Sequence, residues 1–399
     1  MASDIPATGI PRPIRTAGAV TFGALFAVES FARAINATVV SLQAYDLLKS
    51  SQKVSELSTL VSLCVLAASL TLPLFMARVP RRWIYTAGGL IMMMACVLLA
   101  SHTIIGQASG SFMRNLAASM MNVALSLYIL DHFKKADLTR VEPLRLSLST
   151  VSWTIGPSLG VWLYTTHGPW APQAAAIASS GVLLVFFWYL RLGDHAIIRR
   201  GGEGQPSPLD NVSRFISQPR LRLAWMIAFG RSCYWATFFI YGPLLLLEGG
   251  LGKQAGGWMI SLSQLVLATS FLFGRLSRRI GVRKVIAGAF AVAAAAAIAA
   301  GFAGTAHPLI AAGLLLAGAL ACSALDAVGG IPYLRAVRHR ERPQMTSVYR
   351  TFIDFSELIP AAMFSLVLLY FPIGSVFVLL GLWLCVVCFI AARHLPRSL

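Results

Sequence analysis

The sequence has 399 residues, of which 57% are hydrophobic and only 12% are charged, whereas soluble domains carry about a quarter of charged residues. This composition excludes an ordinary soluble domain and makes a lipid bilayer the expected solvent. The net charge of +18 would suggest a nucleic-acid partner in a soluble protein, but the distribution of that charge, described below, has a different explanation.

Twelve apolar segments follow one another along the chain. Their centres lie near residues 31, 66, 92, 119, 155, 181, 235, 265, 294, 320, 358 and 383. Each is roughly 20–25 residues long, enough to cross ~30 Å of hydrocarbon at 1.5 Å per residue. Since lipid offers no partner to backbone groups, each segment is predicted to be a helix. The sequence therefore predicts an all-α membrane protein with twelve transmembrane helices and short connections.

Lysine and arginine gather on one side of these segments. If the N-terminus lies in the cytoplasm and the chain crosses the membrane twelve times, the outside loops hold only three of the 33 basic residues, Lys49, Lys53 and Lys253. Basic residues are retained on the cytoplasmic side of a membrane. We therefore expect both termini in the cytoplasm, a multi-pass protein of the cell (inner) membrane, and no nucleic-acid partner.

The longest polar interruption divides the chain. Residues 191–222 are rich in glycine, proline and arginine, a composition typical of a linker. We expect an N-terminal six-helix bundle over residues 1–190, a cytoplasmic linker over 191–222 and a C-terminal six-helix bundle over 223–399.

The two halves echo each other. The basic pattern of residues 72–83 returns at 273–284, and Pro157 and Pro360 occupy corresponding places in the fifth and eleventh segments. Halves of six helices enter the membrane from the same side, so they form parallel repeats. Secondary transporters built in this way bind substrate between the halves, near the middle of the membrane.

Two motifs carry a resemblance to a known family. "GRLSRRIGVRK" (274–284) is similar to the G-x-L-x-x-R-x-G-x-R-K loop of the major facilitator superfamily, although Pro73 replaces the first glycine in the equivalent loop of the first half. "TIGPSLG" (154–160) is similar to the G-P-x-x-G element of the family's proton antiporters. The resemblance implies two pseudo-symmetric six-helix bundles, alternating access and proton-coupled efflux. It also implies that the basic loop acts as a gate through Gly274, Arg275, Arg278, Arg279, Gly281, Arg283 and Lys284.

Eight charged residues lie within the apolar segments. The acidic ones are Glu29, Asp326, Asp354 and Glu357, and the basic ones are Arg33, Arg114, Arg231 and Arg350. A charge at the centre of a bilayer costs at least ~2.5–3.5 kcal/mol. The charges either form buried pairs that fix helix packing or face a cavity, and we favour the cavity. By depth we expect one cluster in each half, with Arg231, Asp326 and Asp354 in one network.

Helical spacing groups polar residues with these charges. Candidate substrate-binding or proton-coupling residues are Glu29, Arg33, Asn36, Arg114, Asn115, Asn122, Arg231, Tyr234, Trp235, Asp326, Asp354 and Glu357. In the resembled family, helices 1, 4, 7 and 10 line the pathway. Since no histidine lies in either cluster, a carboxylate must carry the proton, and we expect Glu29 to do so with Arg33 and Arg114 as its partners.

The sequence thus predicts a monomeric secondary transporter that moves a small anionic or zwitterionic organic solute together with protons, in the direction of efflux. The alternative is a proton symporter that takes up an organic anion, and a receptor that transports nothing is less favoured. An enzyme is not expected, because the spans hold no histidine and no nucleophile–base pair. No cofactor and no metal are expected.

The predicted topology can be tested with reporter fusions. Fusions after residues 50, 105, 168, 250, 306 and 372 are expected to report the outside, and a fusion near 205 the inside, because basic residues stay in the cytoplasm. A cytoplasmic report at residue 250 would contradict the arrangement in two halves.

Overall fold

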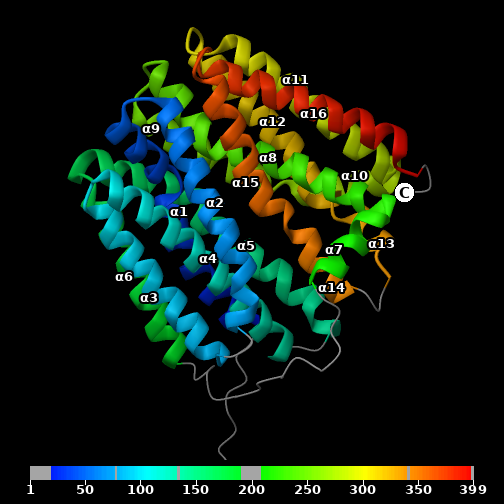
Figure 1. Ribbon diagram of the computed structural model, residues 1–399, viewed down its shortest axis with the longest axis horizontal. Coiled ribbons are helices and arrows are strands. Elements are labelled where there is room, and N and C mark those ends of the chain that lie inside the picture. The colour runs from blue at the N-terminus through cyan, green and yellow to red at the C-terminus, as the bar shows by residue number, and fades with distance from the viewer. Residues whose placement is uncertain (1–18, 77–78, 133–134, 190–207, 339–341, 397–399) are drawn as a thin grey trace, which may run out of the picture.

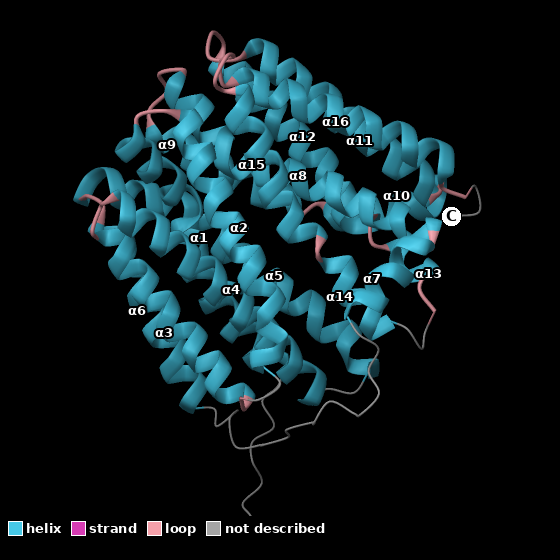
Figure 2. Cartoon of the chain, in the orientation of Figure 1, coloured by secondary structure: helices cyan, strands magenta, loops and turns pink. Residues whose placement is uncertain are grey.

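The computed structural model describes residues 19–76, 79–132, 135–189, 208–338 and 342–396, and within these ranges the chain is helical without strands (Figures 1 and 2). All twelve predicted centres fall inside helices. The helices of the first half are α1 (Ala19–Leu48), α2 (Ser51–Met76), α3 (Arg81–Ala100), α4 (Ile104–His132), α5 (Lys135–His167) and α6 (Trp170–Tyr189).

The second half has more breaks than the first. Its helices are α8 (Pro219–Glu248), α9 (Lys253–Leu267), α10 (Ser270–Ile280), α11 (Val282–Ala303), α12 (Pro308–Val328), α13 (Ile331–Ala336), α14 (Arg342–Arg350), α15 (Phe352–Val367) and α16 (Gly374–His394). The predicted eighth span is formed by α9 and α10, which bend by 43° relative to each other. The tenth span continues from α12 into α13, and α14 precedes α15 in the eleventh.

Hydropathy differs among these helices. In the described ranges, six helices are long and apolar enough to cross a membrane by that measure alone, or seven if the bent pair counts as one span. Among the helices that fall short, α9 and α15 have only 15 and 16 residues, and α4 and α8 carry the arginines Arg114 and Arg231 in their middle. These two arginines are among the residues predicted to line the protein interior, so the lower hydropathy of α4 and α8 fits the fold.

The helices form two bundles that meet along two seams. In the first bundle α1 packs on α5 and α3 on α4, and in the second α11 packs on α16 and α12. The bundles contact each other mainly through α5 with α9 and α2 with α15. Figure 1 shows the blue and cyan helices α1 to α4 on one side and the orange and red helices α15 and α16 on the other.

A separate helix, α7 (Pro208–Ser217), lies within the predicted linker. Phe215 of α7 is buried in a small cluster with Leu221 and Tyr333 of the second half. The next helix, α8, begins at Pro219, a little before the predicted boundary at residue 223. Residues 191–207 of the predicted linker lie outside the described residues. We call the end of the molecule that holds α7 the linker end and the opposite one the far end.

The G-P-x-x-G element brings two helices into backbone contact. A Cβ atom on Gly156 of α5 would lie 2.5 Å from the Cβ atom of Ala34 in α1, and one on Gly160 would lie 1.9 Å from the Ile35 carbonyl oxygen. Small residues allow such close approach of helices in membranes. The element therefore joins α1 to α5 tightly.

The contacts between the bundles repeat with the internal symmetry. The Gln254 side chain of α9 donates a hydrogen bond to the carbonyl oxygen of Ser158 in α5 at 3.0 Å. The Ser55 hydroxyl of α2 donates a hydrogen bond to the carbonyl oxygen of Ala361 in α15 at 2.8 Å. Both acceptors directly follow a proline inside a helix. Equivalent parts of the two bundles thus exchange equivalent bonds, as parallel repeats require.

Gly160→Ala tests the α1–α5 contact. We expect a loss of ~1–3 kcal/mol in stability, the cost of forcing a methyl group into a filled contact, measured by thermal unfolding in detergent. Gly288→Ala in α11 is the matched control, because nothing lies within 4 Å of its added Cβ atom. Equal stability of the two variants would contradict the contact.

Candidate functional site

Two ion pairs lie at mid-helix depth, one in each bundle. In the first, Arg33 Nη1 lies 3.7 Å from Glu29 Oε1, one turn away on α1. In the second, Arg231 Nη1 of α8 lies 3.0 Å from Asp326 Oδ1 of α12. The structure thus contains a loose pair within one helix and a close pair between two helices.

The loose pair has one buried and one accessible member. The Glu29 side chain has no exposed surface, and Arg33 is 22% exposed. The Tyr85 hydroxyl of α3 donates to Glu29 Oε2 at 3.2 Å. The carboxylate is therefore anchored inside the first bundle while the guanidinium reaches accessible surface.

The close pair is more firmly held. The indole nitrogen of Trp235 donates to Asp326 Oδ2 at 3.0 Å, and the Arg231 guanidinium lies 5.6 Å from the centre of the Phe352 ring. Both charged side chains keep accessible surface, 21% for Arg231 and 27% for Asp326. A charge-assisted hydrogen bond at this distance is among the stronger polar contacts in proteins.

Three aromatic rings connect the two pairs. The Arg33 guanidinium lies 6.0 Å from the centre of the Trp153 ring. The Trp153 ring of α5 packs edge-on against Phe239 of α8 with 5.9 Å between centroids, and Phe239 lies 6.1 Å from Trp235. We call Trp153, Phe239 and Trp235 the aromatic bridge. It crosses the boundary between the bundles, so both ion pairs lie at that boundary.

A second group of charges lies nearby. Arg114 of α4 interacts electrostatically with Arg33 and with Glu357 of α15 in the other bundle. The Ser69 hydroxyl of α2 donates to Asp354 Oδ2 at 3.3 Å. Asp354 therefore bonds across the boundary to the first bundle, instead of joining the expected network with Arg231 and Asp326. The reason is the packing of α15 on α2, which turns this face of α15 towards the first bundle.

Two candidates from the sequence are directed into their own bundles. The fully buried Asn36 side chain of α1 lies 3.7 Å from the Cys96 sulfur of α3. The fully buried Tyr234 hydroxyl of α8 donates to the Leu315 carbonyl oxygen of α12 at 2.5 Å. Neither faces the boundary between bundles, because buried polar groups in a membrane take their partners from neighbouring helices.

Other candidates lie outside the two ion pairs. Asn115 and Asn122 are half-buried on α4. Arg350, which was expected among the charges within the apolar segments, is exposed at the end of α14. The structure therefore brings together Glu29, Arg33, Arg231, Trp235 and Asp326 around the aromatic bridge. Spacing along one helix did not reveal Tyr85, Trp153 and Phe239, which belong to α3, α5 and α8.

The basic loop motif connects α10 to α11. Gly281 between these helices has φ of +90°, a conformation that favours glycine. Arg283 donates a hydrogen bond to the Ala392 carbonyl oxygen in the last turn of α16. A cation is favourable at the C-terminal end of a helix. The other members lie in α10 or just beyond Gly281, and Arg275, Arg278, Arg279 and Lys284 are exposed.

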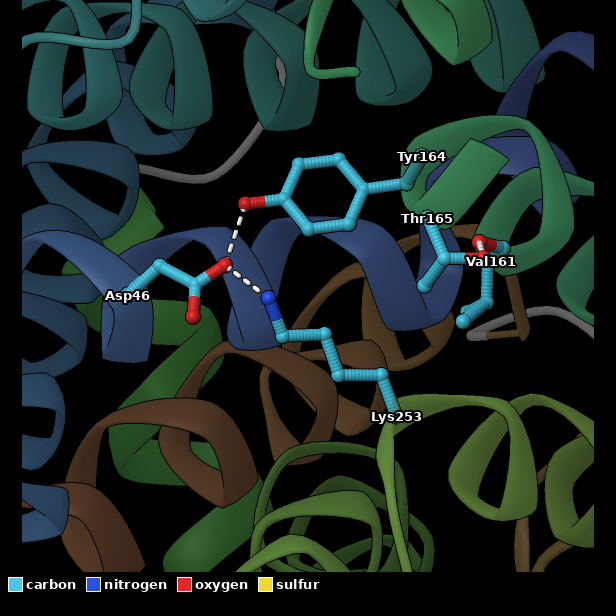
Figure 3. Close-up of polar contacts among 5 residues, drawn as sticks. All are labelled: Asp46, Val161, Tyr164, Thr165 and Lys253. Carbon is cyan, nitrogen blue, oxygen red and sulfur yellow. Dashed lines mark hydrogen bonds and ion pairs between the residues drawn. The ribbon is translucent and has the colours of Figure 1, made fainter. Parts of the chain in front are cut away.

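At the far end, one carboxylate joins three helices. Asp46 Oδ2 of α1 accepts hydrogen bonds from the Tyr164 hydroxyl of α5 and from Lys253 Nζ of α9, each at 2.5 Å (Figure 3). The Lys253 nitrogen also lies 5.0 Å from the centre of the Tyr164 ring. We call Asp46, Tyr164 and Lys253 the far-end latch. The sequence assigned Lys253 to an outside loop and gave no signal for its partners.

Two further bonds accompany the latch. The Ser51 hydroxyl donates to Glu248, and Ser55 shares a hydrogen bond with the Tyr241 hydroxyl. Each of these two bonds joins α2 of the first bundle to α8 of the second. Polar contacts therefore join the two bundles at the far end.

The comparisons with known proteins show the family through one match and the fold through others. The family model described as Major Facilitator Superfamily matches residues 22–269. Among solved structures, the nucleoside transporter NupG has 13% sequence identity and a TM-score of 0.74 over 95% of this chain and 100% of its own. A POT family transporter in complex with 5-aminolevulinic acid has 11% identity and a TM-score of 0.77 over 97% of each chain. A bacterial homologue of the iron transporter ferroportin has 16% identity and a TM-score of 0.69 over 96% of this chain and 100% of its own. At these identities the structures establish the fold alone. A search of curated protein sequences gives no match.

Asp46→Asn tests the far-end latch. Loss of a charged acceptor is expected to weaken the closed form by about 1.5 kcal/mol or more, roughly tenfold in population. Spin labels at the exposed residues Thr166 and Thr305, in a cysteine-free background, measure the opening as longer inter-label distances. Glu56→Gln is the matched control, because this exposed carboxylate bonds only to Gln52 among the contacts described in α2. An unchanged distance distribution in Asp46→Asn would exclude a latch.

Proposed function

The chain belongs to the major facilitator superfamily, and from that premise we propose that this secondary transporter exports a small anionic or zwitterionic organic solute in exchange for protons. It is a multi-pass membrane protein and a transporter rather than an enzyme. The proposal concerns its substrate class, its coupling ion and its direction.

The observation that carries the proposed substrate class and proton coupling is the loose pairing of Arg33 with Glu29. Arg33 is accessible at the boundary between the bundles, and Glu29 is buried behind it. An arginine nearby favours the ionised carboxylate, whereas desolvation favours the protonated one. An anionic substrate that binds Arg33 weakens the attraction between Arg33 and Glu29, and Glu29 then takes up a proton. A proton that arrives first frees Arg33 for substrate, so in either order the proton and the substrate favour each other's binding, which is the linkage of symport. The proposed exchange therefore rests on the antiporter element described below.

Groups packed around Glu29 set the balance. Besides Arg33, the Tyr85 hydroxyl donates to its second oxygen, which favours the ionised form. Arg114 and Glu357 act on Arg33 from α4 and α15. We propose that Arg114 supplements Arg33 and that Glu357 keeps the site close to neutral when no substrate is bound.

Alternating access requires that one end close while the other opens. The far-end latch and the Ser55–Tyr241 bond support a form that is closed at the far end. With the predicted topology this end faces the outside, and the substrate reaches the site from the cytoplasm. Breaking the latch then exposes the site to the outside. The Arg283 bond to Ala392 joins α11 to α16 within the second bundle, so it does not hold the two bundles together.

The export direction rests on the resemblance of residues 154–160 to an antiporter element. These residues lie at the joint of α1, α5 and α9, where Gly160 touches α1 and Ser158 accepts from Gln254. A movement of one bundle on the other passes through this joint. Uptake by symport remains the alternative, and it requires the opposite response to an imposed pH gradient.

Glu29→Gln tests the coupling in proteoliposomes. The substrate is first identified by thermal shift, because a ligand at a hundredfold excess over Kd stabilises the folded state by ~2.7 kcal/mol. Glutamine keeps the shape and resembles the protonated carboxyl group. We expect the variant to fold, to bind substrate with little dependence on pH between about 6 and 8, and to lose transport against a gradient.

Glu56→Gln serves as the control, since this carboxylate is exposed on α2 and accepts a hydrogen bond from Gln52. It is expected to transport like the unmodified protein. Wild-type, pH-driven transport by Glu29→Gln would refute the assignment of Glu29 as the coupling carboxylate.

A further inference from the structure

The accessible charges at the boundary have opposite signs at the two ends of the aromatic bridge. Arg33 lies against Trp153 at one end, and Asp326 accepts from Trp235 at the other. Both side chains expose about a quarter of their surface, whereas Glu29 exposes none. A ligand that spans the bridge therefore meets a cation at one end and a carboxylate at the other.

Arg33 is the better receptor for an acid. Its distance of 3.7 Å from Glu29 is longer than a hydrogen bond, so its guanidinium donors are available to a ligand. Arg114 adds positive charge nearby. Guanidinium groups bind carboxylates through two parallel hydrogen bonds, which fixes the orientation of the acid.

Asp326 is the better receptor for a hydrogen-bond donor. Its two oxygens each have one partner, Arg231 and Trp235. An ionised carboxylate offers about four acceptor sites, so two remain, and the side chain is accessible. An ammonium group can bind there without displacing Arg231.

The middle of the ligand must match the rings. Trp153, Phe239 and Trp235 are each partly accessible and have 5.9 and 6.1 Å between successive centroids. Flat aromatic groups pack well at such spacings, since ring pairs prefer centroid distances of about 4.5–7 Å.

We propose that the substrate is a bipolar aromatic acid, with its carboxylate on Arg33, its ring along the aromatic bridge and its ammonium group on Asp326. This assignment rests on the proposed function and narrows its substrate class. A substrate with two acids fits less well, because a carboxylate on Arg231 would compete with Asp326 at 3.0 Å and leave that charge without its arginine.

The test compares matched probes by calorimetry on the full-length protein in nanodiscs. The bipolar probes are 4-(2-aminoethyl)benzoate and the longer 4′-(aminomethyl)biphenyl-4-carboxylate, which differ in the span between their charges. The corresponding amides lack the acid, the corresponding alkyl compounds lack the amine, and terephthalate carries two acids. We expect one bipolar probe to bind at least about tenfold more tightly than each of its truncated analogues, the effect of one charge-assisted hydrogen bond.

Variants assign each end of the probe. Arg33→Gln is expected to abolish the preference for acid over amide and to keep the preference for the amine. Asp326→Asn is expected to do the reverse. Since Asp326→Asn leaves Arg231 without its carboxylate, Asp326→Glu is measured as well, and it is expected to fold and keep the preference for the amine. The exposed residues Arg393 and Glu56 provide the controls Arg393→Gln and Glu56→Gln, which are expected to leave both preferences unchanged.

The proposal is overturned if neither bipolar probe binds, if terephthalate binds more tightly than both, or if Arg33→Gln and Asp326→Asn leave the preferences unchanged. These results are separable from a failure of the proposed function. Proton-driven transport of another solute, together with absent probe selectivity, would overturn the bipolar site alone. Selective probe binding together with wild-type transport by Glu29→Gln would overturn the coupling role alone.

Discussion

The pairing of charges in a medium without water governs this structure. A charged side chain at the centre of a bilayer is costly, so each of the mid-helix arginines Arg33 and Arg231 lies beside a carboxylate of its own bundle. The pairs are placed at the boundary between bundles, where part of each remains accessible. A charge that is paired and accessible can exchange its partner for a ligand, whereas a fully buried pair can only hold helices together. The position of the pairs thus decides whether they serve packing or transport.

The close contact of α1 and α5 links this site to the far end. Gly156 and Gly160 bring the two backbones together, and the same two helices carry Arg33 and Trp153 at mid-depth and Asp46 and Tyr164 at the far end. Packed helices do not deform continuously, so a change at one end of such a pair is transmitted as a rigid movement. Lys253 of α9, in the other bundle, bonds to Asp46 of this pair, so such a movement would change that bond. In the proposed cycle, ligand exchange at Arg33 and opening of the latch are two effects of one movement of the α1–α5 unit.

Much of this arrangement follows from the sequence, and the remainder depends on tertiary contacts. Hydropathy located the twelve helices because the bilayer requires apolar segments of fixed length, and the spacing of Glu29 and Arg33 placed them one turn apart. Periodicity identifies a face of a helix but not the neighbour that this face meets, so Asn36 was expected at the boundary and instead lies against α3. The partners of Asp46 could not be predicted, since 207 residues separate it from Lys253. The helix α7 was not predicted, because it is short and lies in a segment rich in glycine and proline.

The difference between the two ion pairs assigns them different tasks. The Arg231–Asp326 pair joins two helices at 3.0 Å and is supported by an indole donor, so its separation would leave a carboxylate poorly compensated. The Arg33–Glu29 pair lies within one helix at 3.7 Å, which is longer than a hydrogen bond. A coupling site needs a partner that can be released by a substrate of ordinary affinity, because a ligand shifts an equilibrium only by its differential binding energy. The looser pair meets that requirement and the close pair does not, so the proposed coupling of proton and substrate belongs to the first bundle and the proposed fixed end of the binding site to the second.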